Sequence, residues 1–110
     1  MRTFQAYEEW LQPFKLYIKL PYPLQYCTMK LAGEVGEVSE KIAKTYRDHN
    51  GTFSPERKLE IAKELGDVLW YLTAISGELG FSLARVAELN MEKLNSRLER
   101  GTLQGEGDNR

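Results

Sequence analysis

Two long segments of this chain repeat apolar residues at helical spacing, and only a short break separates them. The first runs from about residue 25 to 48 and the second from about 55 to 79. Residues 49–52, His-Asn-Gly-Thr, give a stop signal, and Ser54 before Pro55 gives an N-cap followed by a first-turn proline. Because a connection this short makes neighbouring helices antiparallel, one face of the first helix must lie against one face of the second.

The remaining segments also have helical patterns. Residues 3–18 are amphipathic, although Pro13 should bend or end that helix. Gly80 and Ser82 end the second long segment and begin a fourth helix that reaches about Leu98. No alternation with a period of two persists, so the expected class is all-α, a four-helix antiparallel bundle.

The chain divides into one domain and a short tail. Residues 1–100 form the helical domain, and a subunit interface would usefully enlarge the core of a domain this small. Residues 101–110 contain three glycines and almost no apolar side chains, so we expect a flexible Gly-rich tail or a loop that a ligand orders.

Two acidic pairs interrupt the apolar pattern of the long helices. Glu34 and Glu37 are three residues apart in the first, and Glu64 and Asp67 are three residues apart in the second. Each pair therefore lies on one helix face, and small or apolar neighbours indicate that these faces point inward. Antiparallel pairing of the helices brings the two faces opposite each other and predicts one site with four carboxylates.

Such a group of acids needs either protons or a cation. Two like charges about 4 Å apart repel by roughly 4 kcal/mol at an effective dielectric near 20. We favour a divalent metal, because carboxylate oxygens suit Mg²⁺, with Mn²⁺ as a substitute. One Cys and one His cannot build the usual zinc sites. A di-iron bundle would require Glu-x-x-His, which the acidic pairs lack.

Glycines accompany the acids at positions 33, 36 and 66. Each costs about 1 kcal/mol relative to Ala in a helix, so the three together predict close approach of a backbone or a ligand. A single acidic pair on a helix is usually a solvated face; two pairs with apolar and glycine neighbours favour a site. A non-catalytic helical interaction module that holds a structural cation remains the alternative to an enzyme.

Composition excludes several classes of protein. The net charge of −1 argues against binding to polymeric nucleic acid, and no window has the roughly 18 apolar residues of a membrane-spanning helix. Charged residues interrupt the apolar pattern near the N-terminus, which predicts no signal peptide. The single Cys27 cannot form an internal disulfide. We expect a cytoplasmic protein that associates as a homo-oligomer.

Three segments resemble the MazG-like nucleoside triphosphate pyrophosphohydrolases, small single-domain members included. They are residues 31–38 (LAGEVGEV), 63–72 (KELGDVLWYL) and 90–97 (NMEKLNSR). The resemblance spans essentially the whole chain, and the ending RGTLQGEGDNR fits it. It implies an all-α pyrophosphatase fold, Mg²⁺ dependence, a dimer or dimer of dimers, and hydrolysis of NTP or dNTP to the monophosphate and pyrophosphate, as in house-cleaning enzymes.

The same resemblance assigns roles to individual residues. Glu34, Glu37, Glu64 and Asp67 take the metal-ligand positions, and Glu34 or Glu37 would activate the attacking water. Asn90 and Lys93 correspond to polar residues of the fourth helix that approach substrate, the amide toward ribose or base and the amine toward phosphate. A related all-α enzyme acting on another pyrophosphate substrate, such as a phosphoribosyl-linked nucleotide, is a third hypothesis.

Two further side chains are candidate substrate contacts. Tyr22 lies in a break bracketed by prolines and could stack on a base, whereas Trp70, Tyr71 and Tyr26 have the spacing of core or interface aromatics. Arg110, at the end of the tail, would add positive charge if the tail folds over bound phosphates.

Overall fold

The computed structural model describes residues 3–101, 105 and 107, and within them the chain is all-α, as predicted. The elements in chain order are α1 (Phe4–Leu11), η1 (Gln12–Phe14), η2 (Leu16–Lys19), α2 (Pro23–His49), α3 (Pro55–Glu78) and α4 (Leu83–Glu99), where η marks a 3₁₀ turn. The described residues contain no strand. Most of the predicted tail, including Arg110, lies outside the described residues.

The helix boundaries follow the capping signals of the sequence. Ser54 and Ser82 each accept a hydrogen bond from a backbone N–H of the first turn, at 3.1 and 3.0 Å, and begin α3 and α4. Asn50 ends α2 in the left-handed conformation at φ 52°, followed by Gly51 at φ 76°. These two residues turn the chain back within a few positions, as the stop signal predicts.

The N-terminal segment is broken where Pro13 predicts a break. Helix α1 ends at Leu11, and the chain continues through η1 and η2 rather than as one helix to residue 18. The proline ring removes a backbone donor and clashes with the preceding turn, which accounts for the early end. Phe14 consequently lies at the end of a 3₁₀ turn, where it can face α3.

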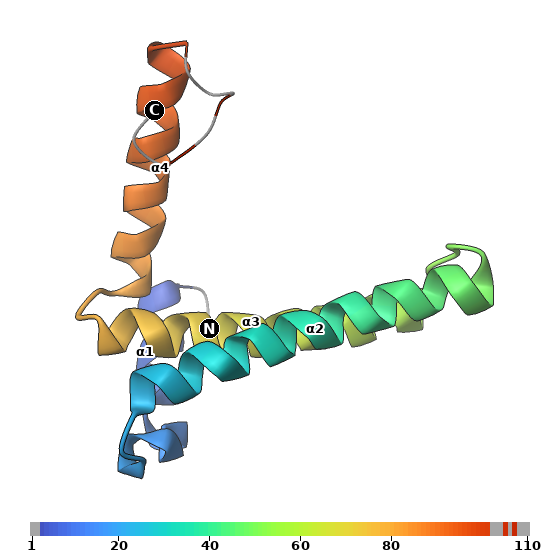
Figure 1. Cartoon of the computed structure of the whole chain (residues 1–110), viewed down its shortest axis with the longest axis horizontal. Helices are drawn as coiled ribbons and strands as arrows, with labels where there is room; N and C mark the ends of the chain where they lie inside the picture. The colour runs from blue at the N-terminus through green and yellow to red at the C-terminus, as the bar shows by residue number, and fades with distance from the viewer. Residues whose placement is uncertain (1–2, 102–104, 106, 108–110) are drawn as a thin grey trace.

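Helices α2 and α3 form the predicted antiparallel hairpin and run side by side along its length (Figure 1). An arginine ties the two helices together near the tip. Arg57 of α3 donates through Nε to Thr45 Oγ1 at 2.8 Å and through Nη2 to the carbonyl of Lys41 at 3.2 Å. Thr45 is fully buried and donates its own hydroxyl to the same carbonyl at 2.8 Å.

The buried core lies at the other end of the hairpin. Tyr17 from η2, Cys27 from α2 and Ala74 from α3 form its centre. Three partly buried residues of α3 pack against them: Trp70, Tyr71 and Ile75. Cys27 is therefore a buried thiol, and burial is the largest cause of its raised pKa.

Helix α4 leaves the hairpin instead of lying along it. It starts at the end of α3 and extends away at a steep angle, beside α1 (Figure 1). Glu8 of α1 holds this corner by accepting a 2.6 Å hydrogen bond from the backbone N–H of Leu83. One chain therefore supplies four helices but surrounds α4 only near its first turns. None of the described helices combines the length and apolar composition needed to cross a membrane.

We predict that Thr45→Val destabilises the hairpin. Valine keeps the volume but removes the acceptor of Arg57 Nε, which would cost about 1–2 kcal/mol, or roughly 5–10 °C in Tm. Thr28→Val is the matched control, because the Thr28 hydroxyl only donates to the Leu24 carbonyl within α2. Thermal unfolding followed by circular dichroism measures both, and equal Tm values for the two variants would contradict the prediction.

Candidate metal centre

Three of the four predicted acids come together across the hairpin. Glu34 from α2 and Glu64 and Asp67 from α3 each place one carboxylate oxygen within 4.8 Å of the others. The short connection sets the register of the two helices. Each acid lies on the face of its helix that is turned toward the other helix, and the three carboxylates therefore converge. It is the one group of three or more potential metal-ligating side chains within that distance among the described residues.

The fourth acid, Glu37, lies outside this group. It is one turn beyond Glu34 on α2 and is exposed, yet it is near enough to contribute to the raised pKa of Glu34. The four acids are also more exposed than the small and apolar residues around them in the sequence had indicated. Glu34 and Glu64 are partly buried, whereas Glu37 and Asp67 are exposed, because helix α4 does not cover this side of the hairpin within one chain.

The local electrostatics disfavour the ionised form of Glu34. Burial raises its pKa first, and the negative charge of Asp67 raises it further. Glu37 and Glu64 add to the effect, while Lys30 opposes it. A divalent cation between the three carboxylates would relieve this repulsion.

The glycines beside the acids have no backbone packed against them in this chain. A Cβ added at Gly33, Gly36 or Gly66 would meet no atom within 4 Å. The expectation of close backbone approach is therefore wrong for the isolated chain. The helix surface next to the carboxylates is open instead, which leaves room for a ligand or a second chain.

Aromatic side chains line a cavity directly beside the acids. Phe14, Trp70 and Tyr71 line an open cleft of about 360 Å³ together with Glu34 and Asp67. Trp70 and Tyr71 follow Asp67 by three and four residues, so helical spacing alone could have indicated this neighbourhood. Phe14 could not be found in that way, since it reaches the site at the end of the 3₁₀ turn that contains Pro13.

Lys30 is another neighbour that the sequence reasoning missed. It precedes Glu34 by four residues and therefore shares its face of α2. Its Nζ lies 5.9 Å from the centre of the Tyr71 ring, and its charge acts to lower the pKa of Glu34. A cation is thus present at the edge of the acidic site.

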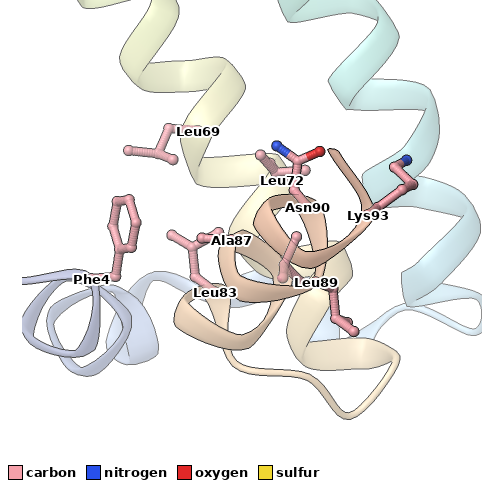
Figure 2. A pocket seen from close by; sticks show the side chains of 9 residues that line it. Phe4, Leu69, Leu72, Leu83, Ala87, Leu89, Asn90 and Lys93 are labelled. Atoms are coloured by element: carbon pink, nitrogen blue, oxygen red, sulfur yellow. The ribbon is translucent and has the colours of Figure 1, made fainter. Parts of the chain in front are cut away.

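Asn90 and Lys93 line a different cavity. They face an apolar groove of about 670 Å³ between α1, α3 and α4. Figure 2 shows both side chains on the same helix as Leu83, Ala87 and Leu89, with Phe4 and Leu69 across the groove. Neither residue lines the cavity of Glu34 and Asp67, so the predicted substrate contacts and the acids do not share a cavity within one chain.

The remaining candidate, Tyr22, is exposed at the N-cap of α2 and lines neither of these two cavities. Its predicted contact with a base therefore stays a prediction.

The sequence profile of the MazG nucleotide pyrophosphohydrolase domain matches residues 24–101. The chain belongs to the MazG family. It is 44% identical over 87 residues to the Gene 37 protein of Mycobacterium phage L5, an alignment that covers 79% of this chain and 76% of the phage protein. No solved structure matches the chain. MazG membership confirms the resemblance drawn from the acidic motifs and implies a nucleotide pyrophosphohydrolase-type hydrolase.

The donor set of this MazG domain fits a hard divalent ion. All three converging groups are carboxylates, and one oxygen of each already lies within 4.8 Å of the others, which is the all-oxygen donor set that Mg²⁺ prefers. Mg²⁺ keeps several water ligands, and three carboxylate oxygens leave positions for water or phosphate. The donors contain no sulfur or nitrogen ligand that would favour a softer metal.

We predict that Glu34→Gln stabilises the metal-free protein, and does so more at pH 7 than at pH 4. A raised pKa means that ionising Glu34 lowers the free energy of unfolding, and this loss develops as pH rises from the ordinary Glu pKa through the raised one. Removing roughly 0.5 kcal/mol of repulsion would raise Tm by about 2–4 °C at pH 7.

Thermal unfolding in chelator at both pH values measures the effect. Glu40→Gln is the control, because Glu40 is exposed on α2 and pairs with Lys44 at 3.4 Å, so its loss should not raise Tm. A Glu34→Gln stabilisation of equal size at pH 4 and pH 7 would show that the charge of Glu34 is not its cause.

Proposed function

We propose that this MazG domain is a Mg²⁺-dependent nucleoside triphosphate pyrophosphohydrolase, which cleaves NTP or dNTP at the α-phosphate to release the monophosphate and pyrophosphate. The observation that carries the proposal is the convergence of Glu34, Glu64 and Asp67 within 4.8 Å. Mn²⁺ would substitute for Mg²⁺, because both prefer oxygen ligands. Such an ion neutralises phosphate oxygens and lowers the pKa of a bound water.

The positions of the acids suggest a division of roles. Glu34, Glu64 and Asp67 would hold the metal, and a metal held there would supply the positive charge that attracts the phosphate oxygens. Glu37 is left outside the converging group, one helical turn away and accessible to solvent. It is therefore our choice for the residue that accepts the proton of the attacking water.

The reaction then balances without any other co-reactant. The water oxygen forms a bond to the α-phosphorus as its proton passes to the Glu37 carboxylate. The bond from the α-phosphorus to the oxygen that bridges the α- and β-phosphates breaks, and pyrophosphate leaves with that oxygen. Lys30, at the edge of the site, is placed to offset part of the negative charge.

We predict that Glu37→Gln and Glu34→Gln fail in different ways. Glu37→Gln should lower kcat by at least about 100-fold, as loss of a general base does, with the Mg²⁺ concentration for half-maximal rate nearly unchanged. Glu34→Gln should raise that Mg²⁺ concentration by about 10-fold or more as well as slowing turnover. Pyrophosphate release across a Mg²⁺ titration measures both effects, and Glu40→Gln serves as the inert control.

Near wild-type rates in both variants would end the proposed mechanism. The same assay separates the other hypotheses. A helical module with a structural cation would bind Mg²⁺ but release no pyrophosphate from a panel of NTPs and dNTPs. An enzyme for phosphoribosyl-linked nucleotides would cleave those substrates and leave the triphosphates intact.

We also propose that the protein works as a homodimer or a dimer of dimers. Its accessible surface is 8196 Å², against about 6,200 Å² expected for a compact monomer of 12.7 kDa. The radius of gyration is 17.0 Å, where about 13 Å is expected. An excess of roughly 2,000 Å² per chain has the size of an obligate dimer interface.

The apolar stripe of α4 is one of the surfaces that a second chain could cover. At the start of α4, Leu83 and Ala87 belong to this stripe and pack against the rest of the chain. Further along the helix, Leu94 and Leu98 continue the stripe and are exposed. A second chain lying on this stripe would cover it and would also enclose the groove that holds Asn90 and Lys93. Acids and substrate contacts from different chains would then share one site.

We predict that Leu94→Glu reduces the mass in solution to that of a monomer and lowers Tm by at least about 5 °C. A charge on the stripe cannot be buried without a large desolvation cost. Ser96→Glu, which adds the same charge on the opposite face of α4, should leave mass and Tm unchanged. Light scattering coupled to size-exclusion chromatography gives the masses, and a monomeric wild-type protein would contradict the prediction.

A further inference from the structure

The two 3₁₀ turns between α1 and α2 form a flap at the end of the hairpin where α2 begins (Figure 1). This flap comprises residues 12–20. Its one buried side chain is that of Tyr17, which is 5% exposed. Its other large apolar side chains are exposed: Phe14, Leu16, Ile18 and Leu20. A single side chain therefore anchors the flap in the core.

Packing alone holds the flap against the hairpin. Backbone hydrogen bonds of 2.9–3.3 Å close its own turns, and Gln12 bonds back to the carbonyl of Glu8 in α1 at 2.8 Å. Among the described residues, no hydrogen bond or ion pair joins the flap to α2, α3 or α4. Segments attached by so few contacts open locally while the rest of a domain stays folded.

The anchor also carries an unsatisfied polar group. The Tyr17 hydroxyl is buried and has no hydrogen-bond partner among the residues that the structure describes. An unpaired buried hydroxyl disfavours the closed form, and water would satisfy this group once the flap opened. The closed and open forms are therefore closer in free energy than burial of the ring alone would make them.

Movement of the flap would change two places at once. Cys27 is fully buried and belongs to the same core cluster as the Tyr17 ring. Phe14, three residues earlier on the flap, lines the cleft beside the acids. Trp70 connects the two places, because it meets the Tyr17 ring edge-on at 5.9 Å and also lines that cleft. Exposure of the thiol and the shape of the cleft are thus coupled.

We propose that the flap is a gate whose opening exposes Cys27, and that an adduct formed on this thiol by a low-molecular-weight disulfide holds the gate open. The Cys27 thiolate attacks one sulfur of the disulfide, a new sulfur–sulfur bond forms, and the other sulfur leaves as a thiolate. Because Cys27 has no free space around it, the attached group keeps the Tyr17 ring from returning. Phe14 then stays away from the cleft. This control of activity rests on the proposed function, whereas opening of the flap does not.

Reaction of Cys27 with the aromatic disulfide dithionitrobenzoate measures opening, because the chain has one cysteine. Tyr17→Phe removes the unpaired hydroxyl and should slow labelling by about 5-fold or more, equivalent to roughly 1 kcal/mol. Tyr46→Phe is the matched control, because Tyr46 is 62% exposed and lies near the tip of the hairpin, and it should react at the wild-type rate. An unchanged or faster rate in Tyr17→Phe would overturn the gate.

Thr45→Val separates opening of the flap from unfolding of the whole domain. It removes the acceptor of Arg57 Nε, far along the hairpin from the flap, and so lowers global stability. If the flap alone exposes Cys27, this variant should be labelled at the wild-type rate. Labelling that accelerates in step with the loss of stability would show that exposure requires global unfolding, and would also overturn the gate.

Methyl methanethiosulfonate tests the control of activity. The Cys27 thiolate displaces methanesulfinate and gains an S-methyl group through a disulfide bond. Pyrophosphate release should fall by about 5-fold or more with unchanged circular dichroism, and dithiothreitol should restore it. Cys27→Ala should not respond to the reagent. Full activity of the modified protein would overturn this control.

The two proposals fail in different ways. An untreated protein that releases no pyrophosphate from any nucleotide would reject the proposed function, while the labelling rates of Tyr17→Phe and Thr45→Val would still decide whether the gate exists.

Discussion

The pairing of α2 with α3 is the constraint on which the rest of this structure depends. A few residues connect the two helices, with Asn50 and Gly51 in left-handed conformations, so their relative register has little freedom. Arg57 reinforces that register by bonding to Thr45 and to the Lys41 carbonyl on the opposite helix. The carboxylates of Glu34, Glu64 and Asp67 converge only because this register is kept.

Local signals were enough to predict most of the fold. Ser54 and Ser82 cap helices where expected, and Pro13 ends α1 because proline acts on its own turn of backbone. The acidic site was predictable for a similar reason. Two helix faces joined by a short connection must meet, so spacing along the chain translates directly into proximity.

What the sequence could not supply is the direction of α4. Its apolar stripe is periodic and clear, but periodicity identifies a buried face without identifying what covers it. Asn90 and Lys93 therefore have a groove of their own in the single chain, apart from the acids. Phe14 was missed because it lies at the end of a 3₁₀ turn, and such turns carry no simple sequence pattern.

The openness of the acidic site has a consequence for how an ion would be held there. Asp67 is exposed, and three carboxylates cannot complete an octahedral shell, so solvent reaches any ion from one side. Under the proposed function, an ion at such a position would exchange readily with solvent, and the polyphosphate would supply the ligands that the three carboxylates lack. The ion would then enter as the counter-ion of each incoming nucleotide, and turnover would follow the free Mg²⁺ level of the cell.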